Sequence, residues 1–115
     1  MNIDEILTQV VYGKTTKSLK ENEEKLDQIA SNNYGELLLI LAKYLSNEEV
    51  EINKRKLSAT ILKNMISKFD PHKEKWITLN PEIKESIKLN ILSTLASQSK
   101  DIVNASSDTI AGKFF

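Results

Sequence analysis

The residues that could carry out chemistry are few and scattered. The chain has one histidine and no cysteine, which excludes thiolate metal ligands and a cysteine nucleophile. His72 lies between Pro71 and Lys73, and no metal-ligating residue stands three or four positions away. The sequence also has no glycine-rich phosphate loop, no serine elbow and no zinc spacing. We therefore expect no metal, no cofactor and no catalytic centre.

Charged clusters are the next place to look for a site. The segment KENEEK (20–25) offers several carboxylates, but it lies on the polar side of a predicted helix, as a solvated face does. The basic runs KRK (54–56) and KEK (73–75) are short and are diluted by acids. Lys and Arg total 16, as do Asp and Glu, so the net charge does not favour nucleic-acid binding. The sequence predicts a non-enzymatic binding surface.

The elements that would hold this surface are helices. Only 3 Gly and 2 Pro occur in 115 residues, helix formers dominate, and no segment alternates apolar and polar residues for long. The fold class is therefore all-α, in one domain over 1–115. The first residues carry two acids and a broken apolar run, so we expect no signal peptide, no membrane span and an intracellular, soluble protein.

Apolar spacing predicts six helices in three antiparallel pairs, at about 2–31, 34–68 and 81–113. The predicted helices are 2–12, 15–30, 34–46, 52–68, 81–97 and 101–113. Helix 34–46 is apolar on nearly every side, which indicates packing between neighbours. Asn80 and Pro81 suit the start of the fifth helix. Two further sets are predicted to face inward: Ile83, Ile87, Ile91, Leu92 and Leu95 in that helix, and Leu57, Ile61, Met65 and Phe69 or Ile66 in the fourth.

Two further features suggest a helical-repeat scaffold. ILAKYLS (40–46) and ILSTLAS (91–97) echo each other, as stacked helical pairs do. Between the pairs, HKEKW (72–76) is expected to form a turn of helix that returns Trp76 to the core. The chain ends on DTIAGKFF without a polar cap, so we expect the N-terminal piece of a longer solenoid, self-associating through an exposed apolar edge.

The stretch RKLSATILKNMISKFDPHKEKWITLNPEIKESIKLNILSTL (55–95) carries a resemblance to a known family. Its features are Arg55, the small pair Ser58-Ala59, Leu62-Lys63-Asn64, then Asp-Pro and Lys75-Trp76, in that order. This order resembles the N-terminal domain of importin-β (karyopherin-β) nuclear transport receptors, over about residues 23–103. The alternative is a HEAT or armadillo-type scaffold, such as a phosphatase or vesicle-coat subunit, without a nucleotide-dependent partner.

The resemblance implies about three HEAT repeats stacked as a superhelix, with 2–12, 34–46 and 81–97 as outer helices. Helices 15–30, 52–68 and 101–113 would then line the concave face. Arg55 would be structural, bonding acids or carbonyls of adjacent repeats, and Trp76 is also assigned to the structural set. The last helix has Asn104 at the place that matches Arg55.

The resemblance further implies a function in nuclear import. In the family, the concave face of the first repeats binds Ran-GTP, and this binding releases cargo. Importin-α or cargo and Phe-Gly nucleoporins would bind later repeats, and the protein would shuttle between cytoplasm and nucleus. The residues implied as Ran contacts are Lys63, Asn64, Ser67, Lys68, Asn104, Asp108, Glu23, Asp27 and Gln28.

Overall fold

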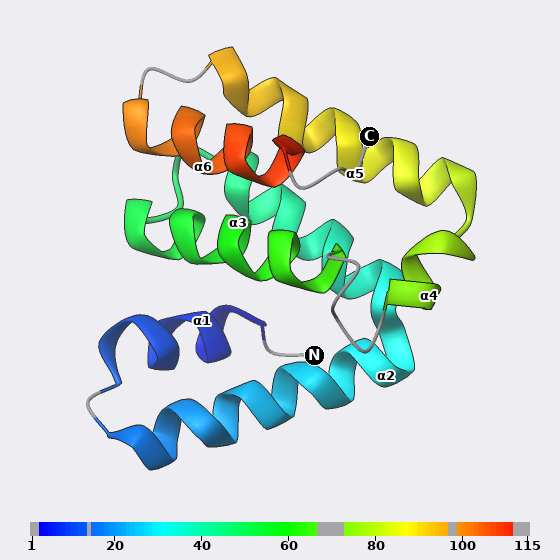
Figure 1. Cartoon of the computed structure of the whole chain (residues 1–115). Coiled ribbons are helices and arrows are strands. Elements are labelled where there is room, and N and C mark those ends of the chain that lie inside the picture. Colours follow the sequence, from blue (N-terminus) through cyan, green and yellow to red (C-terminus); the bar gives the residue numbers. More distant parts are fainter. Residues whose placement is uncertain (1–2, 14, 67–72, 97–98, 112–115) are drawn as a thin grey trace.

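The computed structural model describes residues 3–13, 15–66, 73–96 and 99–111. These residues form α1 (Ile3–Tyr12), α2 (Thr16–Ser46), α3 (Ile52–Ile66), α4 (Lys73–Ile77), α5 (Pro81–Ser93) and α6 (Lys100–Ala111), with a 3-10 turn at Thr94–Ala96 (Figure 1). The predicted all-α class is confirmed. No helix among the described residues has the length and apolarity that crossing a bilayer requires.

The helices stack as three layers of paired helices. α1 packs on the first half of α2, the second half of α2 packs on α3, and α5 follows with α6 (Figure 1). Helix α2 changes direction at Asn33, whose backbone is non-helical at φ −141° and ψ 52°. The sequence predicted a wider break between 30 and 34, whereas a single residue suffices to turn the chain from one pair into the next.

Polar contacts hold the kink in α2. The Lys75 ammonium donates to the carbonyls of Ala30 (3.1 Å) and Ser31 (2.8 Å), the last turn before the kink. A cation at the carboxyl end of a helical segment is favoured by the helix dipole. On the other side of the kink, the buried Tyr34 hydroxyl donates to the carbonyl of Met65 at 3.0 Å. Both halves of α2 are thus fastened to segments more than 30 residues away.

Gly35 allows a close approach directly after the kink. A Cβ atom at this position would lie 2.9 Å from Leu79 Cδ1 and within 3.7 Å of the Ile83 side chain. The missing side chain therefore lets the turn before α5 settle against α2. Asn80 caps α5, its side chain accepting from the Glu82 amide at 2.8 Å, and Pro81 is the first helical residue, as the sequence predicted.

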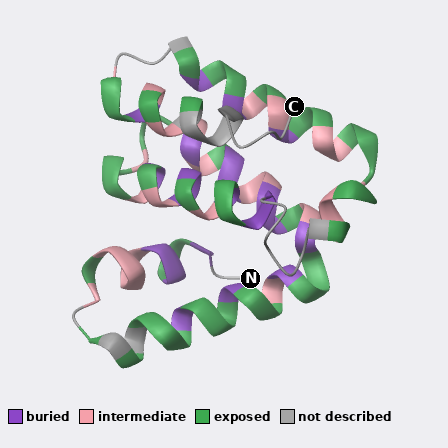
Figure 2. Ribbon diagram, viewed as in Figure 1, coloured by how far each residue is buried: buried purple, intermediate pink, exposed green. Residues whose placement is uncertain are grey.

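The second half of α2 is the centre of the core. It packs against both α3 and α5, and many of its residues are buried (Figure 2). The fully buried set is Leu37, Leu38, Leu41, Ala42 and Leu45. Leu39, Ile40 and Tyr44 are partly buried against the same core. The predicted packing of this helix between neighbours is confirmed.

Helix α1 is fastened to α3 as well as to α2. Its apolar face (Ile3, Ile6 and Leu7) is buried. The Asp4 carboxylate pairs with Lys54 at 3.2 Å. The Tyr12 hydroxyl donates to the Glu51 carboxylate, and this hydrogen bond raises the pKa of Tyr12 above its usual value. The first pair is therefore continuous with the second.

The prediction that Leu92 and Leu95 face the core is wrong. Leu92 is 42% exposed and Leu95 is 40% exposed, whereas Ile87, Ile91 and Thr94 are buried. Leu92 lies about 100° around the helix from Ile91, which is enough to leave the contact with α2. The Thr94 hydroxyl donates to the Ile91 carbonyl, so a short polar side chain closes the core face where α5 tightens into a 3-10 turn.

Helix α4 returns Trp76 to the core, as the sequence predicted. The indole ring is partly buried against the main cluster of apolar side chains. The Lys84 ammonium lies 5.4 Å from the ring centroid, within range of a cation–π interaction. Trp76 thus covers the apolar side chains between the kink of α2 and the start of α5.

Replacing Trp76 by alanine tests this role. A fully buried tryptophan costs about 3–5 kcal/mol when truncated, so the partly buried ring should lower the free energy of unfolding by about 2 kcal/mol. Urea unfolding followed by circular dichroism measures the change. The matched control is Ile77→Ala, since Ile77 is 68% exposed and its truncation should cost less than about 0.5 kcal/mol. Equal effects of the two changes would contradict the assigned packing.

Replacing Lys75 by methionine tests the kink. The methionine keeps most of the aliphatic stem but leaves the carbonyls of Ala30 and Ser31 without their cationic donor. We expect a loss of about 1 kcal/mol, at the lower end for a charged hydrogen bond because Lys75 is partly exposed. Lys17→Met, at an exposed position of α2, serves as the control and should leave the urea midpoint unchanged. A neutral Lys75→Met variant would show that the kink holds without this contact.

Candidate partner-binding face

Helix α3 presents one face to the core and the opposite face outward. Its buried residues are Arg55, Ser58, Ala59, Leu62, Met65 and Ile66. The predicted inward positions were right for Met65 and Ile66, but Leu57 and Ile61 are only partly buried. Phe69 lies outside the described residues. The small side chains of Ser58 and Ala59 are both buried, so they add little bulk to the inward side of α3.

Arg55 fixes that orientation. It is 5% exposed, and its Nε donates to the carbonyl of Leu45 at 3.0 Å. The carbonyl belongs to the last turn of α2, where the helix dipole favours a positive charge. The resemblance implied a bond to an adjacent repeat. The observed bond instead lies within one helical pair, because the end of α2 and the start of α3 are joined by a short turn.

A first groove runs between α3 and the first half of α2. It is open and has a volume of about 370 Å³. Its floor is apolar, with acids on the α2 side and polar groups on α3. The lining residues are Val10, Glu23, Leu26, Asp27, Leu57, Thr60, Ile61, Asn64 and Met65.

A second groove lies on the other side of α3, against α6, which runs beside it (Figure 1). Its volume is about 350 Å³ and its lining is mostly polar: Lys56, Ala59, Thr60, Lys63, Asn64, Asp101, Asn104 and Ala105. Thr60 and Asn64 line both grooves. The two grooves therefore form one continuous surface over the first half of α2, α3 and α6, which we term the inner face.

Five of the nine expected contact residues lie on the inner face. Glu23 and Asp27 line the first groove, Lys63 and Asn104 line the second, and Asn64 lines both. The sequence did not single out Lys56, Thr60 and Asp101 as contacts. Lys56, Thr60 and Lys63 follow the i, i+4, i+7 spacing of one helix side, which is the signal that could have identified the first two.

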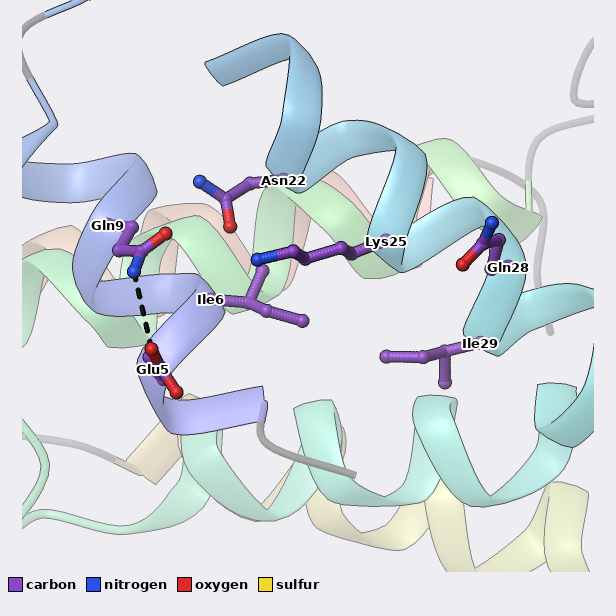
Figure 3. Close-up of a pocket in the computed structure, with 7 residues that line it drawn as sticks. All are labelled: Glu5, Ile6, Gln9, Asn22, Lys25, Gln28 and Ile29. Atoms are coloured by element: carbon purple, nitrogen blue, oxygen red, sulfur yellow. Dashed lines mark hydrogen bonds between the residues drawn. The ribbon is translucent and has the colours of Figure 1, made fainter. Parts of the chain in front are cut away.

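The remaining expected contacts lie elsewhere or cannot be placed. Ser67 and Lys68 fall outside the described residues, and the Asp108 side chain is also not described. Gln28 lines a third groove, of about 250 Å³, between α1 and the first half of α2 (Figure 3). Ile6 and Ile29 line this groove together with polar side chains, and the Gln9 amide donates to Glu5 at 3.4 Å. Gln28 is thus separate from the inner face.

The inner face is lined by charged, amide and apolar side chains. Among the described residues, no three His, Cys, Asp or Glu side chains gather as metal ligands would. Lysines, amides and Asp101 line the second groove, whereas apolar side chains with Glu23 and Asp27 line most of the first, and both grooves are open. Such a surface can bind a folded partner through many shallow contacts, each polar group meeting its complement at the rim and apolar groups meeting in the first groove.

Comparison with known proteins identifies the scaffold. Residues 22–97 match the importin-beta N-terminal domain. Importin subunit beta-1 of Arabidopsis thaliana is 32% identical over 97 residues, covering 80% of this chain and 11% of the relative. Importin subunit beta-1 of Saccharomyces cerevisiae is 31% identical over 96 residues, covering 78% of this chain and 11% of the relative. The chain thus spans about a tenth of the length of these relatives.

Solved structures of importin-beta also resemble this chain. Yeast importin-beta (Kap95p) superimposes with a TM-score of 0.87 at 25% identity, over 97% of this chain and 14% of that chain. A structure in which Kap95p binding induces the switch loops of RanGDP to adopt the GTP-bound conformation gives a TM-score of 0.83 at 26% identity, over 95% of this chain and 14% of that chain. The stacked pairs correspond to the N-terminal HEAT region of these proteins. This chain belongs to the importin-β family of nuclear transport receptors, which are not enzymes.

Proposed function

We propose that this chain is the Ran-binding N-terminal region of an importin-β import receptor, and that its inner face contacts Ran-GTP. The observation that carries the proposal is the convergence of α2, α3 and α6 on one continuous surface, at the positions that the family resemblance assigns to concave helices. Because the chain belongs to the importin-β family, no observation favours the alternative of a phosphatase or coat scaffold.

Preference for the GTP form follows from thermodynamic linkage. Kap95p shifts the switch loops of RanGDP to the GTP-bound conformation. A protein can shift a conformational equilibrium only by binding one state more tightly than the other. Ran loaded with GTP already holds that conformation, so it binds without the cost of the shift. If this chain retains part of the same interface, it should share the same preference.

The inner face has the mixed chemistry that such a partner requires. The second groove places Lys56 and Lys63 opposite Asp101 on α6, whereas the first groove combines apolar side chains with Glu23 and Asp27. Complementary charges on the partner would set its orientation and its association rate. Burial of the apolar floor against the partner would contribute to the binding free energy. Ser67, Lys68 and Asp108 remain proposed contacts, whereas Gln28 is proposed only as a peripheral one.

We propose that the other partners of the receptor bind repeats outside this chain. Kap95 also occurs in a complex with Nup1, and the structure of that complex superimposes on this chain with a TM-score of 0.81. We propose that importin-α or cargo and Phe-Gly nucleoporins bind repeats beyond the three described here. The protein would accordingly pass between cytoplasm and nucleus. Neither a nucleic acid nor a membrane is proposed as a partner.

Titration of the chain with Ran tests the proposal. We expect binding to Ran-GTP to be at least tenfold tighter than to Ran-GDP, which corresponds to about 1.4 kcal/mol. Isothermal titration calorimetry at low and moderate salt measures both affinities. Equal affinity for the two nucleotide states would contradict the proposed switch-dependent contact.

Reversing one charge locates the interface. Lys63→Glu in the second groove should weaken Ran-GTP binding about tenfold and should reduce its salt dependence. Lys43→Glu is the matched control, because Lys43 is also exposed but lies on the second half of α2, outside the inner face. The assignment of the inner face would be refuted if the control weakened binding as much as Lys63→Glu.

A further inference from the structure

The kink in α2 acts on the first groove through a lever arm. Asn33 interrupts the helix, so the backbone dihedrals of this residue connect its two halves. Glu23 lies about 15 Å from Asn33 along the helix axis, and a change of about 10° at the kink would move it by roughly 2.5 Å. Glu23, Leu26 and Asp27 line the first groove opposite α3. The width of this groove therefore depends on the angle at the kink.

Two side chains from one short segment contact α2 on both sides of the kink. The Lys75 ammonium donates to the carbonyls of Ala30 and Ser31, directly before the kink. Leu79 packs against Gly35 directly after it, since a Cβ atom on Gly35 would lie 2.9 Å from Leu79 Cδ1. Lys75 and Leu79 are four residues apart, the spacing of one helix side. In Figure 1 this segment, α4 and the turn after it, lies beside the bend of α2.

The segment that carries Lys75 and Leu79 is itself held in place. The Leu79 amide donates to the Trp76 carbonyl at 3.2 Å, so the turn continues past the end of α4. Trp76 packs against the core, with the Lys84 ammonium 5.4 Å from its ring centroid. The same ammonium donates to the Ile77 carbonyl at 3.0 Å. Because Lys84 belongs to α5, the segment connects α5 to the first half of α2.

We propose that Lys75 and Leu79 clamp the kink of α2, and that Lys75 is thereby a positioning residue for the partner at the inner face. Neither residue lines the first or the second groove, so Lys75 acts through the first half of α2 and not by touching the partner. The effect on binding rests on the proposed function, whereas the clamp is a property of the chain alone. Without the clamp, the first half of α2 samples more angles, and only some of them fit the partner.

Helix α1 limits how far the kink can move. It packs on the first half of α2, and its Asp4 carboxylate and Tyr12 hydroxyl bond Lys54 and Glu51 at the start of α3. The apolar face of α1 remains buried whether or not the clamp is present. Removing the Lys75 contacts should therefore broaden the range of kink angles without detaching the first helical pair.

A distance across the kink tests the clamp. Because the chain contains no cysteine, spin labels can be attached at Lys20→Cys and Lys43→Cys, exposed positions on the two halves of α2. In this background, Lys75→Met should shift or broaden the distance distribution from double electron–electron resonance by roughly 2 Å, as a change of about 10° at the kink implies. Lys75→Arg keeps a cationic donor and should leave the distribution unchanged. Lys17→Met, at an exposed position of α2, is the control.

Leu79→Ala removes the other half of the clamp and should broaden the same distribution. Circular dichroism of each variant shows whether its helices are retained. Unchanged distances in Lys75→Met and Leu79→Ala would overturn the proposal, as would an equal change in Lys17→Met.

Affinity for Ran-GTP tests the positioning role. If about a third of the Lys75→Met molecules hold the required angle, the apparent dissociation constant rises about threefold. Lys75→Arg should restore it, and Lys17→Met, which removes the same charge from α2, should bind as the original chain does. The salt dependence should also stay the same, in contrast to Lys63→Glu, because Lys75 does not touch the partner.

The two measurements separate the clamp from the proposed function. An unchanged affinity of Lys75→Met for Ran-GTP, despite altered distances, would overturn the positioning role. If the original chain does not bind Ran-GTP at all, the proposed function fails, and the distances alone still decide whether Lys75 and Leu79 clamp the kink.

Discussion

Burial of the second half of α2 is the interaction on which the rest of the structure depends. Its leucines contact α3 on one side and α5 on the other, and only a narrow side that carries Glu36 and Lys43 faces water. Fully burying one leucine side chain contributes roughly 1.5–3 kcal/mol, and Leu37, Leu38, Leu41 and Leu45 are all fully buried. The helical pairs therefore fold as a stack, because none of them encloses a core alone.

Fixing α2 also fixes the surface that we propose as the partner-binding face. At the start of α3, Arg55 donates a hydrogen bond to a carbonyl in the last turn of α2. At the end of α3, the carbonyl of Met65 accepts a hydrogen bond from the Tyr34 hydroxyl of α2. Helix α3 is thus held at both ends against α2 and cannot rotate about its axis. Lys56, Thr60 and Lys63 face outward as a consequence, so the buried contacts on one side of α3 determine the polar pattern on the other.

Sequence reasoning succeeded where the signal is local. The apolarity of 34–46, the Asn80 cap and the helical turn at Trp76 each follow from neighbouring residues, and the structure confirms them. It failed where the outcome depends on which helix lies alongside. The sequence alone cannot show that α2 leaves Leu92 in solvent, or that Gln28, 100° around the helix from Asp27, faces α1 instead of α3.

The grooves of the inner face are bounded by helices of successive pairs. The first half of α2, α3 and α6 each belong to a different pair, and only stacking contacts set the distances between them. A change in the angle between the first two pairs would therefore alter the width of the first groove, and a change between the last two pairs would alter the second. A partner that fills both grooves favours one stacking angle, and by linkage that angle favours the partner. In a stack of helical pairs, binding and curvature are thus coupled through the same side chains, with Thr60 and Asn64 at the point where the two grooves meet.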